Sequence, residues 1–443
     1  MRTLSATLTA AQKSTNYDPL WKVVLSRTGQ TTQTYTRTRI LSITETEKTE
    51  APQHHTAEII LNNSDGALTS LNFEHYQCVV SYGMNTSAGE EYSDGAPMRV
   101  RAQELHSGRG ILKCYLRPVG ILDQLDEDKA TLEYTQLDTD TQTVKTLINA
   151  IAGATLLPYA SYSAVTMTYD SEDSLIDSFT PKDYFRVNVN ESRLSKIQEL
   201  LDYTGSKMRA QNDGAIHIFD PVISGTAYNY EYVFNVVGDH TFFSKNIRNR
   251  FVNPNQEDVR SHPDHSTQYS ASATSATSYA LAPKIHTTFA RLASTAQAQS
   301  IANAKIERYE LDAERGFAIV PMNVGQELWD YVQVTDSRQG DSKIGNIQFL
   351  QRNVKIPSGN EPLTFNAMIS FGKVTTKSLE ASLITSALPT VRADGSIDNS
   401  QLAQAVSQLI TYVQELANYV LGNQYRETIP KLHVTEQLII PVE

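Results

Sequence analysis

Residues 401–421 have the sequence QLAQAVSQLITYVQELANYVL, in which the apolar side chains recur at alternating intervals of four and three residues. A stripe with this period stays on one face only when the helix supercoils around a partner, as in a coiled coil. The stripe is formed by Leu402, Val406, Leu409, Val413, Leu416 and Val420. We therefore predict a coiled-coil helix over 401–421, with an oligomer interface at these six positions.

The columns on either side of this stripe are uncharged, which bears on the number of helices that associate. They contain Ala403, Ile410 and Ala417 on one side and Ala405, Tyr412 and Tyr419 on the other. The three leucines of the stripe occupy heptad position d and the three valines occupy position a. This combination favours two helices, but an apolar flank widens the buried face and favours three or more. A helix that packs on its own domain explains the same pattern over so short a stretch, so this alternative stays open.

The composition is that of a folded, multidomain protein. At 443 residues, with 40% hydrophobic and 20% charged residues, the chain exceeds a single core, and about two to four domains are expected. It contains no run of eighteen apolar residues, and its first residues lack the apolar core of a signal peptide. We therefore expect no stable membrane insertion and no export by that route. The two cysteines, Cys78 and Cys114, lie in apolar strand-like runs and indicate folding in a reducing compartment.

The net charge of −11 limits the possible partners. A protein that coats nucleic acid carries a basic excess, so no sequence-specific binding of nucleic acid is expected. An acidic surface past which DNA slides without sticking is compatible with this charge, because like charges repel.

Local patterns divide the chain into segments. Apolar and polar residues alternate over much of 1–122, which is typical of strands in a barrel or sandwich. We expect a mainly β protein with an α+β middle. The predicted order is a first β-barrel domain at 1–122, a mixed α/β middle region at 123–265, a Ser/Thr/Ala-rich linker or loop at 266–283, a helix plus second β-barrel domain at 284–374, a linker at 375–400, the coiled-coil helix at 401–421 and a C-terminal strand segment at 422–443.

Capping and turn residues place some of these elements more closely. Ser192 and Ser294 each precede a stretch with helical apolar spacing and are predicted N-caps; Gln297 completes a capping box with Ser294. The turn at 212–214, Asn-Asp-Gly, separates two short strands and predicts a hairpin. The segment 266–279, STQYSASATSATSY, is too small and polar to form a core and is expected to be a loop.

Enzymatic signatures are absent from the sequence. It has no phosphate-binding glycine loop, no nucleophile elbow and no zinc helix. The best metal-like cluster is His262, Asp264 and His265, but it lies beside the expected loop without a second group of ligands. The pair His54 and His55 is a weaker candidate. We predict no catalytic residue, no metal, no cofactor and no enzymatic activity.

Three segments resemble the tail hub proteins of bacteriophages, which stand at the centre of baseplates and tail tips. In 324–350, VGQELWDYVQVTDSRQGDSKIGNIQFL, a Gly and an Asp precede a Val-rich strand, and a Gly turn precedes a Gly-Ile strand. In 193–221 a helix ends in Thr-Gly and a hairpin turns on Asp-Gly, and 39–71 has an Asn-x-Asp-Gly turn after an extended strand. The residues that carry the first pattern are Gly325, Asp330, Val332, Val334, Asp336, Gly340, Gly345 and Ile347.

The resemblance covers roughly residues 20 to 374 and implies a structural virion protein. Hubs of this family are trimers whose two tube-forming β-barrels per subunit continue the tail tube around an axis. The implied partners are further copies of this chain as a homotrimer, tail tube and distal tail proteins, and tail-tip spike or fibre proteins. The implied location is the tail tip of the virion, after assembly in the host cytoplasm.

Other functions remain open from the sequence alone. Within the structural class, the alternative is a hexameric distal tail protein or a fibre-attachment or receptor-binding protein. A tail-tip cell-wall hydrolase is a further alternative from the enzyme class. The lytic domain that many hub-like proteins carry is not implied here, because this chain ends in linker, coil and strand.

Overall fold

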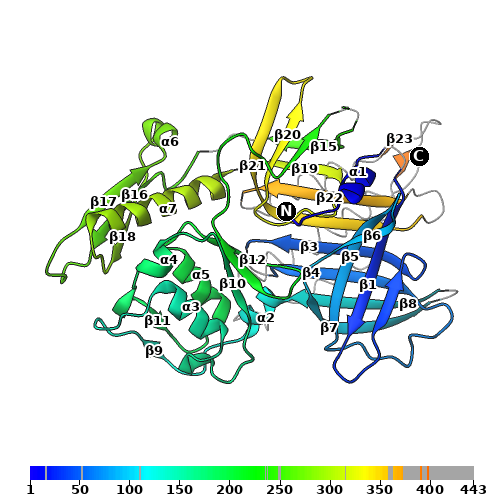
Figure 1. Cartoon of the computed structure of the whole chain (residues 1–443), viewed down its shortest axis with the longest axis horizontal. Helices are drawn as coiled ribbons and strands as arrows, with labels where there is room; N and C mark the ends of the chain where they lie inside the picture. Colours follow the sequence, from blue (N-terminus) through cyan, green and yellow to red (C-terminus); the bar gives the residue numbers. More distant parts are fainter. Residues whose placement is uncertain are drawn as a thin grey trace, which may run out of the picture. The chain divides into compact units, whose positions relative to one another are not determined.

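Antiparallel strand pairing organises most of the chain (Figure 1). The computed structural model describes residues 1–14, 17–50, 53–108, 111–234, 236, 238–247, 251–314, 316–357 and 363–372, and the backbone of 390–391 and 397–398. Contact density separates Met1–Lys373 from Val374–Glu443. The six predicted interface residues of the coiled coil lie outside the described residues.

The largest element is a 14-stranded sheet whose N-terminal half comes from the first 120 residues. The order of these strands is β3-β4-β8-β7-β5-β1-β2, with β6 paired to β5. Trp21, Val23 and Leu25 are buried in one core and alternate on β1 with the partly exposed Lys22, Val24 and Ser26, as the two-residue period of a strand predicts. The strands are β1 (Pro19–Ser26), β2 (Gln33–Thr36), β3 (Ile40–Lys48), β4 (His55–Asn62), β5 (Gln77–Thr86), β6 (Gly89–Asp94), β7 (Met98–Gly108) and β8 (Ile111–Gly120).

The other half of this sheet comes from much later in the chain. Its order is β15-β19-β22-β21, and β20 pairs with both β21 and β14. The long strand β21 bends at a bulge between Ile347 and Phe349, so its first part pairs with β20 and its second part with β22. These strands are β14 (Tyr230–Val233), β15 (Ser244–Ile247), β19 (Gly316–Pro321), β20 (Tyr331–Asp336), β21 (Asp341–Lys355) and β22 (Thr364–Phe371).

The two halves join where β3 pairs antiparallel with β21, from Lys48 opposite Phe349 to Ser42 opposite Lys355. One path of strands therefore runs from β15 to β2, and no pairing among the described strands closes either half into a ring. The expectation of a mainly β fold with helices is confirmed. The strands predicted to form two barrels instead belong to one continuous sheet.

A helical region is inserted between the two halves. Its core combines α2, α3 and α5 with a three-stranded sheet of order β10-β13-β12. Ser192 accepts a hydrogen bond from the Ser195 N–H and caps α5, which confirms the predicted cap. The hairpin of β12 and β13 turns at Gly214, whose φ is +82°. The elements are α2 (Ile121–Glu127), α3 (Val144–Ala152), α4 (Leu175–Ser178), α5 (Arg193–Leu201), β9 (Tyr134–Thr135), β10 (Met167–Asp170), β11 (Arg186–Val187), β12 (Lys207–Ala210) and β13 (Ile216–Phe219).

A second small sheet, of order β17-β16-β18, packs on the long helix α7 (Figure 1). Ser294 caps α7 as predicted and accepts from the Gln297 N–H, whereas the Gln297 side chain accepts from the N–H of Ala293, one residue before the position that a capping box requires. Ala298, Ile301 and Ala302 of α7 belong to the same core as the helical region. The elements are β16 (Gln256–Ser261), β17 (Ser270–Thr274), α6 (Ala276–Leu281), β18 (Ile285–Ala290) and α7 (Thr295–Ala313); helix α1 (Ala6–Gln12) precedes β1.

The structure departs from the predicted segment boundaries. The linker or loop at 266–283 instead contains β17 and α6, because Ala271 and Ala273 alternate with Ser and Thr and turn their small side chains toward the helical core. Strands β14 and β15 lie in the large sheet rather than in the middle region. Within the second unit, β23 (Thr390–Val391) pairs antiparallel with β24 (Ile397–Asp398), inside the predicted linker at 375–400.

Among the helices in the described ranges, none combines the length and the apolar character that crossing a bilayer requires.

The packing of β17 yields a first prediction. Ala271→Asp places a charge opposite buried Val259, at a cost of at least about 2 kcal/mol for an unpaired polar group. Limited proteolysis should then cleave 266–283 more than about tenfold faster than in the wild type. Ser270→Asp, on the exposed neighbour, should leave the rate unchanged. Equal cleavage of both variants and the wild type would show that this segment is the loop that its composition predicts.

Candidate functional site: a buried charged junction

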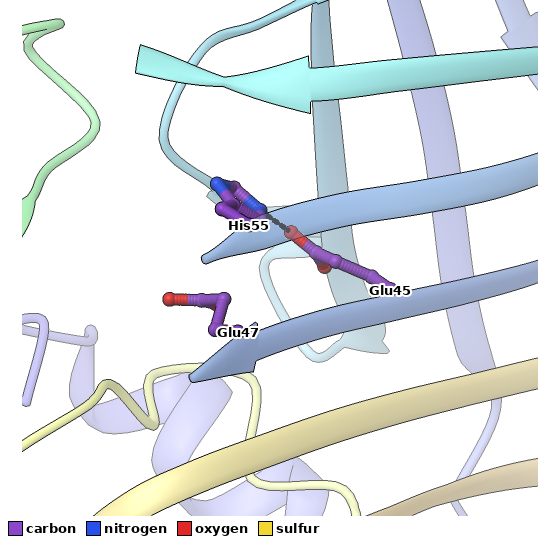
Figure 2. Close-up of side chains that lie close together, drawn as sticks. All are labelled: Glu45, Glu47 and His55. Atoms are coloured by element: carbon purple, nitrogen blue, oxygen red, sulfur yellow. Dashed lines mark hydrogen bonds and ion pairs between the residues drawn. The ribbon is translucent and has the colours of Figure 1, made fainter. Parts of the chain in front are cut away.

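Charged side chains are buried where β3 meets β4 and β21. Glu45 and Arg352 are each only 1% exposed, although they lie 307 positions apart in the sequence. Figure 2 shows Glu45 and Glu47 on β3, with His55 at the start of β4 turned toward Glu45. A buried charge is costly unless it is paired and hydrogen-bonded, so the contacts of this cluster decide whether it stabilises the fold.

The cluster pairs two carboxylates with two basic groups. His55 Nε2 lies 2.8 Å from Glu45 Oε1, and Arg352 Nη1 lies 3.3 Å from Glu45 Oε2. The same Nη1 also donates to Glu47 Oε1. Arg352 Nη2 donates to the carbonyl oxygen of Gln326, while Arg352 Nε is buried without a partner among the described residues. One guanidinium thus links β3 with the segment that precedes β20.

Backbone geometry brings these groups together. Glu45 and Glu47 are two residues apart on a strand and therefore lie on the same side of it. His55 fits because Gly120 stands beside it: a Cβ on Gly120 would come within 2.7 Å of the His55 Cβ. Asp123 of α2 accepts hydrogen bonds from the His54 and His55 backbone N–H groups, which fixes the start of β4.

Neighbouring charges and hydrogen bonds shift the pKa values of Glu45 and His55. Burial alone would raise the pKa of Glu45, but the Arg352 charge and the His55 hydrogen bond outweigh burial and hold this pKa below its usual range. Burial likewise acts to lower the pKa of His55, yet the hydrogen bond to Glu45 and the charge of Glu47 outweigh it and raise this pKa. Each of the two shifts favours the charged form of its group.

Three of these residues could in principle ligate a metal ion. One ligand atom each from Glu45, Glu47 and His55 lies within 4.8 Å of the other two. Arg352, however, already donates to both carboxylates. A cation would have to displace this guanidinium, so the arrangement is suited to holding strands together rather than to binding a metal.

Two of the residues that carry the hub pattern, Gly325 and Asp330, flank Gln326, whose carbonyl oxygen accepts from Arg352. The Asp330 carboxylate accepts from the Gln326 side chain and the Glu327 backbone N–H, both at 2.8 Å. Arg209 of β12 reaches the same group, with Nη1 3.4 Å from Asp330 Oδ1 and 3.0 Å from the Leu328 carbonyl oxygen. Gly340, with φ +64°, turns the β20–β21 hairpin. Asp330 therefore shapes the segment that Arg352 holds.

The candidates that the sequence singled out have other partners. Asp264 is bound by Arg291, which also pairs with Asp183, and His262 hydrogen-bonds to Asp264. His265 Nδ1 lies 2.6 Å from the Thr267 carbonyl oxygen. The loop at 262–265 is thus an ion-pair link to the start of α7.

Comparison with solved structures identifies the architecture. The chain is similar to the tail protein from Neisseria meningitidis, with a TM-score of 0.54 over 80% of this chain and 96% of that one. The two chains share a fold. The hub resemblance of the sequence is confirmed at this level, that of the fold alone, because only 10% of the aligned residues are identical.

Two other tail proteins are similar at lower scores. A 43 kDa tail protein of a Shewanella oneidensis prophage has a TM-score of 0.49 and 12% identity, covering 80% of this chain and 98% of that one. A prophage tail protein from Listeria monocytogenes has a TM-score of 0.49 and 14% identity, covering 82% and 98%. No family model and no curated protein matches the chain in sequence.

Removal of the guanidinium tests the junction. Arg352→Met leaves Glu45 and Glu47 without their shared guanidinium partner, and the free energy of unfolding in urea should fall by about 3–5 kcal/mol. The matched control is Arg117→Met, which breaks the half-exposed pair of Arg117 with Glu104 and should cost less than about 1 kcal/mol. Adding Glu45→Gln to Arg352→Met should restore part of the loss. Equal effects of the two single variants would contradict a structural role for the buried pair.

The shifted pKa of His55 predicts a pH dependence of stability. A raised folded-state pKa means that protonated His55 stabilises the fold below about pH 6.5, the unfolded value, and that this contribution is lost as pH rises through the folded value. Thermal unfolding should therefore show wild type losing more Tm than His55→Gln between pH 6 and pH 9.

The exposed His106 provides the control for this titration. His106→Gln should reproduce the wild-type dependence on pH. If His55→Gln has the same pH dependence as wild type, the imidazole does not carry the charge that the contact with Glu45 implies.

Proposed function

We propose that this chain is a structural virion protein, the trimeric hub of a bacteriophage tail tip or baseplate. The observation that carries the proposal is the fold shared with a tail protein over nearly the whole length of that chain. In this role the two halves of the large sheet would provide the tube-forming β-barrel domains that continue or cap the tail tube. The helical region and the α7 sheet would dock tail-tip proteins.

The described site supports a mechanical role. Its charged groups are 1–16% exposed by side chain and pair with one another, so they are placed to hold strands in register rather than to meet a substrate. A hub transmits load between a tube and its tip. The buried ion pairs of Arg352 with Glu45 and Glu47 resist sliding of β3 along β21. This argument favours a structural over a catalytic function.

The trimer in this proposal rests on the heptads at 401–421. Three helices suit their uncharged flanks, and a threefold assembly with two barrels per subunit would match the sixfold symmetry of a tail tube. The expected partners are tail tube and distal tail proteins on one side and spike or fibre proteins on the other.

Mass in solution and the heptad register test this function together. Light scattering should give about three times the chain mass of 49.2 kDa. Val413→Asp places a charge from every chain in one buried layer and should shift the protein to monomers while the described domains stay folded. Gln414→Asp, on the solvent face of the register, should leave the mass unchanged. A mass near six chains would favour a distal tail protein. Identical behaviour of the two variants would contradict the heptad register and the coiled coil that it predicts.

A further inference from the structure

A cleft of about 810 Å³ opens at one end of the N-terminal sheet half, against the β12–β13 turn. The sheet pairing builds one wall: Ser26 of β1 lies opposite Gln77 of β5, which lies opposite Arg99 of β7. Directly opposed residues on neighbouring strands share a face of the sheet, so these three side chains form one row. Gly214 closes the cleft from the other side, where a Cβ would lie 3.8 Å from Pro97.

The lining of this cleft is basic. Arg27, Arg99 and His75 contribute to it, and none of its lining residues in the described ranges is acidic. The rest of the polar lining consists of side chains that can donate hydrogen bonds: Ser26, Thr28, Gln77, Gln124 and Gln211. A cleft without carboxylates is unexpected in a chain whose net charge is −11.

Neither Arg27 nor Arg99 has a carboxylate partner among the described residues. Of the arginines in the described part of the chain, all but Arg27, Arg99 and Arg186 form an ion pair. Two of these three line the same cleft. The Arg27 guanidinium lies over the Tyr76 ring, 6.0 Å from its centre, which directs it without neutralising it.

The backbone beside the arginines is also unusual. His75 has φ +64°, a conformation that residues other than glycine rarely adopt, and its N–H is held by the Val100 carbonyl oxygen at 2.9 Å. Such conformations persist where the surrounding structure enforces them, and they concentrate at binding sites. This conformation places the His75 side chain in the cleft lining, next to β7.

We propose that this cleft binds an acidic segment of a partner protein, with a carboxylate on each of Arg27 and Arg99. Guanidinium groups bind carboxylates through two parallel hydrogen bonds, and the volume accommodates several side chains. A long polyanion such as DNA fits less well, because beyond this local cleft it would meet a surface of net negative charge. The choice of a protein as partner rests on the proposed structural role, whereas the anion site itself does not.

Fluorescence anisotropy of a labelled hexaglutamate peptide, added to the full-length protein at low salt, tests this site. Binding should be saturable, should weaken as salt is raised, and should fall by at least about tenfold in the double variant R27A/R99A. The control is R186A, which removes the third exposed arginine without an ion pair, one that lies outside the cleft, and this variant should bind as wild type does. Unchanged thermal unfolding would confirm that the variants are folded.

Two outcomes would overturn the proposal. Equal binding by wild type and R27A/R99A would remove the anion site. The second outcome is that a six-nucleotide oligothymidine binds more tightly than hexaglutamate and that this binding is lost in the same double variant. The cleft would then be a site for phosphate groups of nucleic acid rather than for an acidic protein segment. Neither outcome depends on oligomeric state, so failure here stays distinguishable from failure of the trimeric hub.

Discussion

The pairing of β3 with β21 is the contact on which the rest of the structure depends. It joins strands from opposite ends of the described chain, and Arg352 reinforces it by binding Glu45 and Glu47 across the joint. The cores follow the pairing: Val354 and Phe365 from the late strands pack in the same cluster as Val23 and Ile43. Without this contact the two halves of the sheet would expose apolar faces at their shared edge.

The inserted region depends on the same joint. After β8 the chain leaves the sheet to form the helical region, returns with β14 and β15 as strands of the late half, leaves again to form the α7 sheet, and re-enters with β19. Arg209 of β12 binds the Asp330 segment, and Arg352 binds the carbonyl oxygen of Gln326 in that segment. One short segment before β20, which includes Gly325 and Asp330 of the hub pattern, therefore connects the insertion with the sheet junction.

Local features of this structure could be predicted from sequence, and long-range pairing could not. The caps at Ser192 and Ser294 and the turn at Gly214 follow from residue chemistry within a few positions. The assignment of β14 and β15 to the large sheet, and the meeting of Glu45 with Arg352, depend on contacts that leave no local signal. One clue existed: Glu45 and Glu47 occupy the strand face of buried Ile43, where a charge requires a partner. The segment 270–274 forms a strand although its composition predicts a loop. Its alanines are small enough to pack on a helix, but small residues are also typical of linkers.

We propose that a fold shared with a tail protein, a sheet held by buried charge and a predicted threefold coil together form a hub that works by mechanical connection. Electron cryomicroscopy of phage particles that contain this chain tests that claim most directly, since it gives both the position and the copy number. The account predicts three copies around the axis at the tail tip, with the large sheet continuing the wall of the tube. Density for this chain in the fibres, in the tube itself or in six copies would contradict it.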